Sequence, residues 1–392
     1  MSFRTGLCAT GARRPARVLA GVLAAGSLAA IAAGPAGIAS GSTKAGPPAG
    51  SITVFSQGDV NVENLWQKVL IPRYEKKFPE DRINLVFTTN SAENTDVYDE
   101  LAASAKAGKS SSFDLLDGAV PAEAAPAGLL TPITASEIPA ASEVDPSAFK
   151  VVDGDAIPLR GSEVLLAYNS QAVKNPPKTL NDLISWIHAH PGEFSYCNPS
   201  DGGSGAAFVE AVLSKYAPAA ENLKMQLGYS PSAEKYWAKG LQVLKSLTPD
   251  VFQQQYPNSN TGVITLLASG AIEMGTVWSD QGTTALDDGE LPSVIKLTEI
   301  TPPLEGGPDY LGVPKNIPQA KKELAYQFIN WALQPDQQVA IVRAMHGTPA
   351  IEFKYLPAKT AQLFADYSTS PELPYSANTG ADMNSKWTSV VG

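Results

Sequence analysis

A strand and a turn are encoded in residues 52–59, Ile-Thr-Val-Phe-Ser-Gln-Gly-Asp. The apolar run is typical of a short buried strand, and the Ser-Gln-Gly-Asp that follows it is typical of a turn. Trp66, Val69, Leu70 and Tyr74 then recur at helical spacing. We therefore expect a β-strand that leads directly into an α-helix.

The same alternation continues along the next sixty residues. Residues 83–87 form a second apolar run, and Val97, Leu101 and Ala105 follow at helical spacing. Residues 113–116 form a third apolar run. A β-α-β-α-β order predicts parallel strands joined by right-handed crossovers.

The rest of the chain alternates in the same way and shows no repeat of fixed period, so a solenoid or a propeller is not expected. Thr179 is predicted to cap a helix that carries apolar residues at helical spacing. Further strands are expected at residues 163–168, 194–196, 272–278, 294–297 and 310–313, and further helices at 206–216, 262–268, 319–333 and 335–345. We predict an α/β fold with two lobes, each a mostly parallel sheet flanked by helices.

The N-terminus carries an export signal. Four arginines and no acidic residue precede the apolar run 18–33, and small residues end at Ala39. This order predicts a secretory signal peptide cleaved near Ala39, because sixteen residues rich in Ala and Gly are short for a membrane anchor. No Cys follows the apolar run, so no lipid attachment site is expected. Residues 40–50 are rich in Gly, Ser, Pro and Ala, which predicts a flexible tether.

Composition excludes several classes of protein. The 392 residues include 29 Lys and Arg against 39 Asp and Glu, and the formal net charge is −10. Removing the four arginines of the signal leaves 25 basic residues and a charge near −14. An acidic chain is a poor partner for nucleic acid. Two Cys and three His argue against a disulfide-rich fold and a zinc site, and no cofactor is expected.

A glycine-rich turn, residues 199–205, separates a predicted strand from a predicted helix. Gly203 and Ser204 lie where backbone N–H groups at a helix start can bind an anion or the polar end of a small molecule. The turn is equally compatible with a plain connection in which Ser204 caps the helix. It also resembles part of a hydrolase nucleophile elbow, but that motif requires Gly at position 206, which is Ala.

Polar side chains follow each of the first three predicted strands. Gln57 and Asp59 follow the first, Asn90 follows the second and Asp117 follows the third. In open α/β sheets, ligands bind beyond the carboxyl ends of the strands. These four residues are therefore candidate ligand contacts, although ordinary turns would have the same composition.

An aromatic ring and a carboxylate end the strand predicted at 272–278. Trp278 and Asp280 together could hold a cation, the ring through its quadrupole and the acid through its charge. Tyr310, at the start of a later apolar strand, is a weaker candidate of the same kind. The alternative places Trp278 in the core and Asp280 on a surface loop. No three potential metal ligands have a recognisable spacing.

Several segments, in order along the chain, resemble the extracellular solute-binding proteins of bacterial ABC importers. They are Leu165-Leu166-Ala167-Tyr168-Asn169, the Pro-Pro-Lys-Thr-Leu of residues 176–180, the Leu-x-x-Gly-x-x-x-Met of residues 267–274, Gly312-Val313-Pro314-Lys315-Asn316 with 325–331, and Pro335-Asp336-Gln337-Gln338. The spacing from Trp186 through Pro191 and Phe194 to Tyr196 is most similar to the branch that contains thiamine, polyamine and iron binders.

This resemblance implies a type II periplasmic-binding fold, in which two lobes joined by crossover strands close on one ligand by a hinge motion. The first lobe would take residues 51–158 and 293–392, and the second 159–292. Residues at the strand ends would face the cleft: Asp59, Asn90, Asp117, Ser204, Trp278 and Tyr310. The protein would be exported, act as a monomer without catalysis, and present its ligand to a membrane permease.

The expected ligand is a small cation such as a polyamine or a thiamine-like molecule, because carboxylates and aromatic rings dominate the strand ends. Ferric iron is less expected, since iron-type members use adjacent tyrosines and this sequence has no Tyr-Tyr pair. An oxyanion bound at residues 202–205 remains open. A secreted hydrolase using Ser204 and a non-transport interaction protein also remain as alternatives.

Overall fold

The computed structural model describes residues 50–89, 93–364 and 371–392. The predicted signal peptide with its cleavage point near Ala39, the predicted tether up to residue 49, and Asn90 lie outside these described residues. Within them, no helix is long and apolar enough to cross a membrane.

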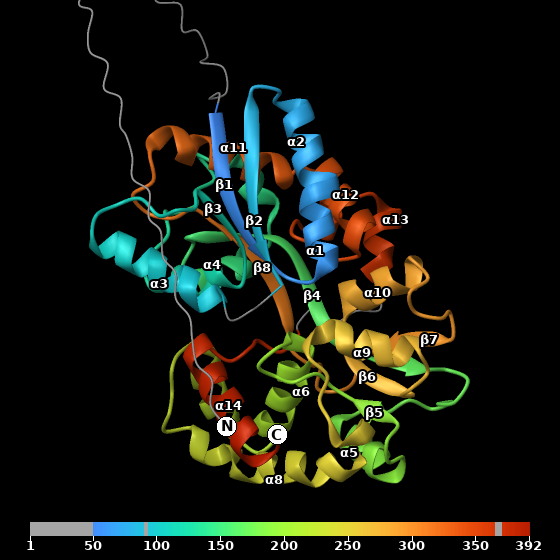
Figure 1. Cartoon of the computed structure of the whole chain (residues 1–392). Coiled ribbons are helices and arrows are strands. Elements are labelled where there is room, and N and C mark those ends of the chain that lie inside the picture. The colour runs from blue at the N-terminus through green and yellow to red at the C-terminus, as the bar shows by residue number, and fades with distance from the viewer. Residues whose placement is uncertain (1–49, 90–92, 365–370) are drawn as a thin grey trace, which may run out of the picture. The chain divides into compact units, whose positions relative to one another are not determined.

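The strands form one connected sheet in the order β2-β1-β3-β8-β4-β6-β5, and β7 and β9 also pair with β4 (Figure 1). Their bounds are β1 Gly50–Gln57, β2 Asp81–Thr88, β3 Leu115–Gly118, β4 Ala156–Asn169, β5 Phe194–Ser195, β6 Met274–Trp278, β7 Ile295–Thr298, β8 Gly306–Gly312 and β9 Thr348–Pro349. Each strand predicted from the sequence is present, with bounds that differ by a few residues.

Helices flank this sheet. They are α1 Val60–Asn64, η1 Leu65–Leu70, α2 Ile71–Lys77, α3 Glu93–Lys106, α4 Val120–Ala124, α5 Leu180–Ala189, α6 Gly203–Ser214, α7 Ala219–Leu227, α8 Trp237–Leu247, α9 Ser259–Ala268, α10 Ser279–Asp287, α11 Gln319–Ala332, α12 Pro335–Met345, α13 Ala358–Ala361 and α14 Ala377–Val390. The α/β class is confirmed. Thr179 caps α5 as predicted, since its hydroxyl accepts a hydrogen bond from the Asp182 N–H.

The opening β-α-β-α-β unit is parallel, as predicted. In the aligned register, Ile52 of β1 lies beside Ile83 of β2, and Val54 lies beside Leu115 of β3. The prediction of mostly parallel sheets does not hold further along, because β8 runs antiparallel to both β3 and β4, and β6 runs antiparallel to β4. The β7 strand already runs antiparallel to β4, and the chain continues from it in the same direction into β8.

The fourteen-residue strand β4 connects the two parts of the sheet (Figure 1). Its first half pairs with β8 and its second half pairs with β6 and β7. The register shifts between Pro158 and Arg160. Proline has no N–H to donate to a ladder, so an irregularity at this point is expected.

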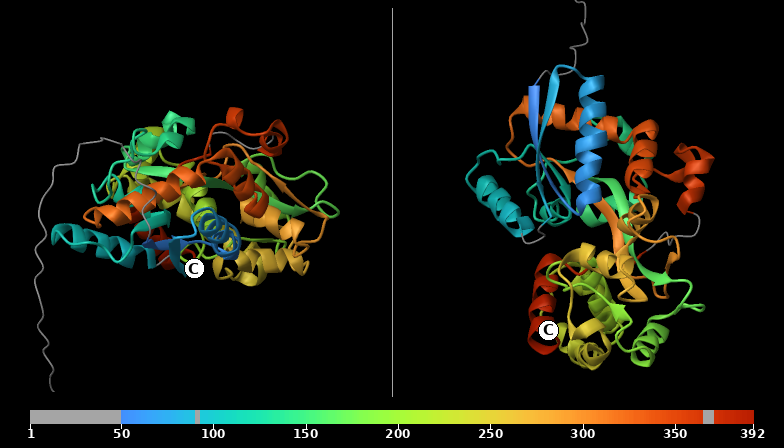
Figure 2. Two further views of the ribbon diagram at one scale, coloured as in Figure 1. Left: turned by 90° about the horizontal axis from the view of Figure 1, so that it is seen from above. Right: turned by 45° about the vertical axis from the view of Figure 1, so that its right-hand side comes forward.

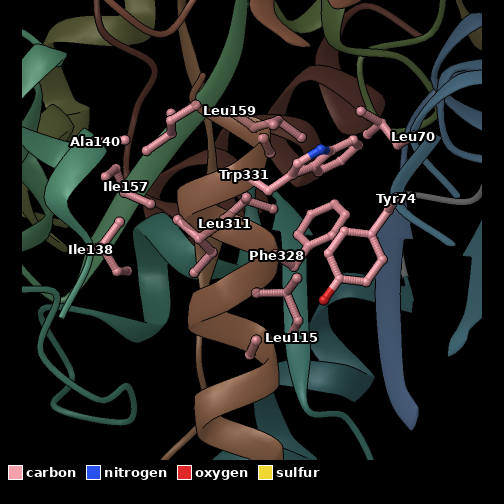
Figure 3. Close-up of a cluster of buried hydrophobic side chains, with 14 of the residues drawn as sticks. Leu70, Tyr74, Leu115, Ile138, Ala140, Ile157, Leu159, Leu311, Phe328 and Trp331 are labelled. Carbon is pink, nitrogen blue, oxygen red and sulfur yellow. The ribbon is translucent and has the colours of Figure 1, made fainter. Parts of the chain in front are cut away.

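The core beneath β1 is built on aromatic rings. Trp66 stacks on Phe328 with their centroids 5.3 Å apart, and Tyr74 meets both Phe328 and Trp331 edge-on. Figure 3 shows Phe328 and Trp331 on one helix face with Tyr74 and Leu70 opposite them. The spacing of Trp66, Leu70 and Tyr74 predicted this buried helical face, and all three side chains are buried.

A second core surrounds α6 and α8, and the C-terminal helix α14 belongs to it. Trp387 of α14 is buried and donates a hydrogen bond from Nε1 to the Tyr196 hydroxyl. The right-hand view of Figure 2 shows α14 in red beside the helices of this core, and α14 contacts α6 and α8. The predicted division assigned residues 293–392 to the first lobe, whereas the side chains of α14 pack with residues of the predicted second lobe.

Buried carboxyl groups gather where β4 meets β8. Glu163 of β4 is buried, and burial together with the neighbouring Glu299 raises its pKa to about 8. Burial also raises the pKa of Glu305 to about 8. The pKa of Glu210 is raised as well, first by burial and then by the charge of Glu305. These groups hold protons at pH values where exposed glutamates have lost them.

Candidate functional site

The end of β1 directs an acidic residue towards the helices that follow β5 and β6. Asp59 precedes α1 in an extended conformation, with φ −80° and ψ 175°. The preceding Gly58 has φ +159°, and a Cβ there would lie 2.7 Å from a methyl group of Val62. Glycine is therefore required for the chain to turn from strand into helix and to place Asp59 at the start of that helix.

The Asp59 carboxylate bonds to a residue 201 positions away in the sequence. Its Oδ2 accepts a 2.9 Å hydrogen bond from Nδ2 of Asn260, which lies in the first turn of α9. The pKa of Asp59 is raised to about 6, chiefly by burial, while the bond from Asn260 opposes the rise and the charge of Asp280 adds to it. Asp59 therefore titrates close to neutral pH.

A second hydrogen bond between an Asn and an Asp joins the same region, but here the Asn lies on α1 and the Asp on α10. Nδ2 of Asn61, in α1, donates to Oδ2 of Asp280 at 2.9 Å. Oδ1 of Asp280 accepts a 2.5 Å hydrogen bond from the hydroxyl of Ser162 on β4. The α1 segment thus supplies one Asp and one Asn, and α9 and α10 supply the matching Asn and Asp.

The glycine-rich turn is tied to the same residues. Oδ1 of Asn260 accepts a 3.0 Å hydrogen bond from the backbone N–H of Ser204, so Asn260 bridges this turn and Asp59. The Ser204 side chain is completely buried, and its Oγ lies 3.4 Å from Sγ of Cys197. Burial raises the pKa of the Cys197 thiol to about 11, so the thiol stays protonated near neutral pH.

Close packing explains the glycines of this turn. A Cβ on Gly205 would lie 1.9 Å from the carbonyl oxygen of Cys197, and one on Gly203 would lie 2.8 Å from the Trp278 ring. The structure therefore brings Gly203 and Trp278 into direct contact. It also corrects the helix start, because Gly202, and not Ser204, is the N-cap of α6.

Asp117 lies inside the protein. It is fully buried and accepts hydrogen bonds from Ser56 Oγ at 2.7 Å, Trp66 Nε1 at 2.7 Å and Arg160 Nη1 at 2.9 Å. Arg160 is also buried, and its Nη2 lies 3.3 Å from Asp309 Oδ2. These contacts give Asp117 a role in holding β3, β4 and the helix segment η1 together, and its contact with a ligand stays a prediction.

Tyr310 and Gln57 have partners of their own. The Tyr310 side chain is buried against β3, and its hydroxyl donates to the backbone oxygen of Ala148 at 2.9 Å. Gln57 is half-buried and accepts a 3.4 Å hydrogen bond from Asn94. Neither residue bonds to the Asp59 group. The remaining prediction for this edge of the sheet, Asn90, lies outside the described residues.

The structure thus links Asp59, Ser204 and Asp280, three of the predicted site residues, through two that the sequence did not single out. Asn61 and Asn260 make these links. Both lie in the first turn of a helix, where the side chains face the same junction as the strand ends. Their positions just after the candidate loops could have marked them as site residues. Short polar residues are so common at helix starts, however, that such positions are weak evidence for a site.

Carboxylates outnumber basic groups at this junction. Arg160 is shared between Asp117 and Asp309. Neither Asp59 nor Asp280 forms an ion pair within the described residues, and their hydrogen-bond donors are neutral amides and a hydroxyl. In the same part of the chain, no three His, Cys, Asp or Glu side chains are grouped so that they could hold a metal ion.

Comparison with known proteins identifies the family. The family model described as bacterial extracellular solute-binding protein matches residues 73–373. A search of curated proteins found no match. Among solved structures, an ABC transporter substrate-binding protein from Bradyrhizobium japonicum is 18% identical with a TM-score of 0.63, covering 88% of this chain and 100% of its own.

Two further solved structures differ in what they bind. The spermidine/putrescine ABC transporter substrate-binding protein PotD from Streptococcus pneumoniae is 15% identical with a TM-score of 0.62, covering 87% of this chain and 99% of its own. AfuA from Actinobacillus pleuropneumoniae, a periplasmic binding protein with bound fructose-6-phosphate, is 15% identical with a TM-score of 0.61, covering 87% and 98%. These likenesses confirm the periplasmic-binding fold. With the family model matched over most of its length, the chain belongs to the bacterial extracellular solute-binding proteins.

Proposed function

We propose that this protein captures a small cationic solute between two lobes and delivers it, unchanged, to the membrane subunits of an ABC importer. The family assignment supports solute capture, and structural neighbours include substrate-binding proteins of ABC transporters. The protein would work outside the cytoplasm after cleavage of its signal peptide near Ala39. The lobes would be residues 51–158 with 293–392, and 159–292, apart from α14.

One observation carries the choice of a cation. Asp59 and Asp280 both lie at the junction of α1, α9 and α10, close enough for the charge of Asp280 to raise the pKa of Asp59, and only neutral groups donate hydrogen bonds to them. Two carboxylates that form no ion pair favour the arrival of a positive charge, and they disfavour an anion by the same Coulomb interaction. Trp278, packed on Gly203 beside this junction, adds an aromatic surface.

The oxyanion alternative is less well supported by the glycine-rich turn. The N–H of Ser204 is bonded to Asn260, and those of Gly205 and Ala206 are bonded to the Gly202 carbonyl. An oxyanion would have to displace these partners. Arg160, the nearest guanidinium, is already held between Asp117 and Asp309.

The hydrolase alternative also lacks support from the geometry. The hydroxyl of Ser204 is buried against Cys197. The histidines bond elsewhere: His188 to Asp250, His190 to the Trp186 carbonyl and His346 to Asp287. Incubating the purified protein with a panel of p-nitrophenyl esters tests this directly, and we expect no turnover that depends on Ser204.

Thermal unfolding in the presence of single solutes tests the proposed function. The panel should contain 1,4-diaminobutane, spermidine, thiamine, phosphate, sulfate and glucose. A ligand at about one hundred times its dissociation constant stabilises the folded state by about 2.7 kcal/mol. We expect at least one cation to raise the melting temperature and the anions to leave it unchanged.

Variants then locate the site. Asp59→Asn and Asp280→Asn should each weaken the response to the cation, whereas Asp201→Asn should not. Asp201 is a suitable control because it lies exposed beside the same glycine-rich turn. A response to phosphate that survives both site variants would contradict cation capture, and a flat response across the whole panel would contradict small-solute capture itself.

A further inference from the structure

Six residues from three helix starts form a closed ring of contacts at the junction of α1, α9 and α10. Asn61 bonds to Asp280 at 2.9 Å, Gln281 bonds to Thr261 at 3.4 Å, and Asn260 bonds to Asp59 at 2.9 Å. Asn260 and Thr261 are adjacent in the sequence, as are Asp280 and Gln281, and only Val60 separates Asp59 from Asn61. We call this set the polar ring: Asp59, Asn61, Asn260, Thr261, Asp280 and Gln281.

Two acceptors of the polar ring have no donor. Within residues 50–89, 93–364 and 371–392, Asn61 Oδ1 and Gln281 Oε1 are buried and accept no hydrogen bond. Their side chains are 8% and 9% exposed. A buried polar atom without a partner destabilises the protein, and native proteins satisfy nearly all such atoms. These amides are held in place by their own Nδ2 and Nε2 donors, so their oxygens remain directed away from those bonds.

Within the described residues, the carboxylates of the polar ring form no ion pair, although the charge of Asp280 acts on the nearby Arg160 and raises its pKa. The N-terminal ends of α9 and α10 meet here, and their partial positive charge helps Asp59 and Asp280 to tolerate burial. Each helix terminus supplies about half a charge, so the two together leave about one of the two carboxylate charges uncompensated. The polar ring therefore combines negative charge with acceptors, and its own donors are already engaged.

We propose that the polar ring binds an ammonium group that carries at least two N–H donors, and that it selects such cations against quaternary ones of equal charge. This inference rests on the proposed cation-binding function and names the chemical class within it. The carboxylates of Asp59 and Asp280 supply the charge attraction. The amide oxygens of Asn61 and Gln281 supply the selectivity, because a quaternary ammonium cannot donate a hydrogen bond to either.

Paired probes of the same length and charge test the selectivity in the unmodified protein. Isothermal titration would compare 1,4-diaminobutane with its fully methylated bis-quaternary analogue. Each hydrogen bond between a charged donor and a neutral acceptor is worth a factor of about ten or more in affinity. We expect the diamine to bind at least about tenfold more tightly.

Variants at the acceptors should act unequally on the two probes. Gln281→Leu and Asn61→Leu should each weaken binding of the diamine more than binding of the quaternary probe, and Asn61→Leu should also weaken the quaternary probe somewhat because Asn61 holds Asp280. Asn64→Ala is a matched control, since Asn64 lies in the same helix and outside the polar ring. Circular dichroism would establish that each variant is folded, and the comparison of probes in the unmodified protein does not depend on any variant.

The possible results distinguish failure of the proposed selectivity from failure of the proposed cation-binding function. Equal affinity for the two probes would overturn selection by hydrogen bonding and would leave cation capture intact. Binding of phosphate or glucose with no binding of either cation would overturn both proposals. Selection of the diamine that persists unchanged in Gln281→Leu and Asn61→Leu would show that the selectivity resides outside the polar ring and would overturn the assignment.

Discussion

Replacing Asp117 by Asn should destabilise the protein strongly, because it removes one partner of a fully buried ion pair. Asp117 Oδ1 lies 2.9 Å from Arg160 Nη1, and the two side chains are 0% and 2% exposed. Removing one member of a buried pair costs about 3–5 kcal/mol, and here the buried Arg160 would keep only its longer ion pair with Asp309. Asparagine keeps an acceptor oxygen for Ser56 and Trp66, so the loss comes mainly from the missing charge.

Chemical denaturation with urea, followed by circular dichroism, measures this loss. The matched control is Asp309→Asn, which removes the other carboxylate of Arg160 at 3.3 Å from a side chain that is 37% exposed. Solvent weakens such a contact, so the control should cost about 1 kcal/mol or less. The reasoning is refuted if Asp117→Asn unfolds at the same urea concentration as Asp309→Asn. It is also refuted if Asp117→Asn keeps full stability while losing solute affinity, because that would support Asp117 as a ligand contact.

Three further outcomes are expected. The free energy of unfolding should fall as the pH rises from about 5 through 8. Folded Glu163 and Glu305, whose pKa values are raised to about 8, keep protons that the same groups in the unfolded chain release near the ordinary pKa of 4.5. Glu305→Gln should therefore make the melting temperature depend less on pH. Gly205→Ala should prevent normal folding, since its Cβ would lie 1.9 Å from a carbonyl oxygen, whereas Gly380→Ala in open space on α14 should leave the melting temperature unchanged or slightly higher. Trp387→Ala should cost about 3–5 kcal/mol in urea unfolding, and a cost below 1 kcal/mol would contradict the packing of α14 into the second core.

The sequence predicted the early part of the fold well because local patterns and long-range packing agree there. The apolar runs at 52–55 and 83–87 become β1 and β2, and the helical spacing of Trp66, Leu70 and Tyr74 becomes a buried face. The family resemblance rested on five segments in order, and the family model and the solved structures confirm it.

The antiparallel strands around β4 could not be predicted in the same way. Strand direction depends on which strand each segment pairs with, and the apolar runs of β6, β7 and β8 carry no local pattern that distinguishes an antiparallel strand from a parallel one. The helices α7, α8 and α14 were also not predicted, and α14 contains Asn, Thr, Gly and Ser, which are poor helix formers. Packing of Met383 and Trp387 stabilises α14, and that contact is invisible to local patterns.

The arrangement of the candidate residues could be predicted only in part, for a related reason. The strand-end rule selected Asp59 and Asp280, which the structure places at one junction, and it also selected Asp117 and Tyr310, which bond inside the protein. Their contacts with a ligand stay predictions. The rule states where a loop lies and does not state which side chains the interior requires. Asp117 is buried because it pairs with the buried Arg160, and the local sequence does not indicate that an arginine on a strand will be buried.

The placement of β4 has a consequence for the order in which a growing chain can fold. Among residues 50–89, 93–364 and 371–392, β4 pairs only with strands that come later, the last of them Thr348–Pro349, and the second core includes Trp387 near the C-terminus. A chain growing from its N-terminus can therefore pair β1 with β2 and β3 early, but it completes neither half of the sheet until β6, β7 and β8 have been made.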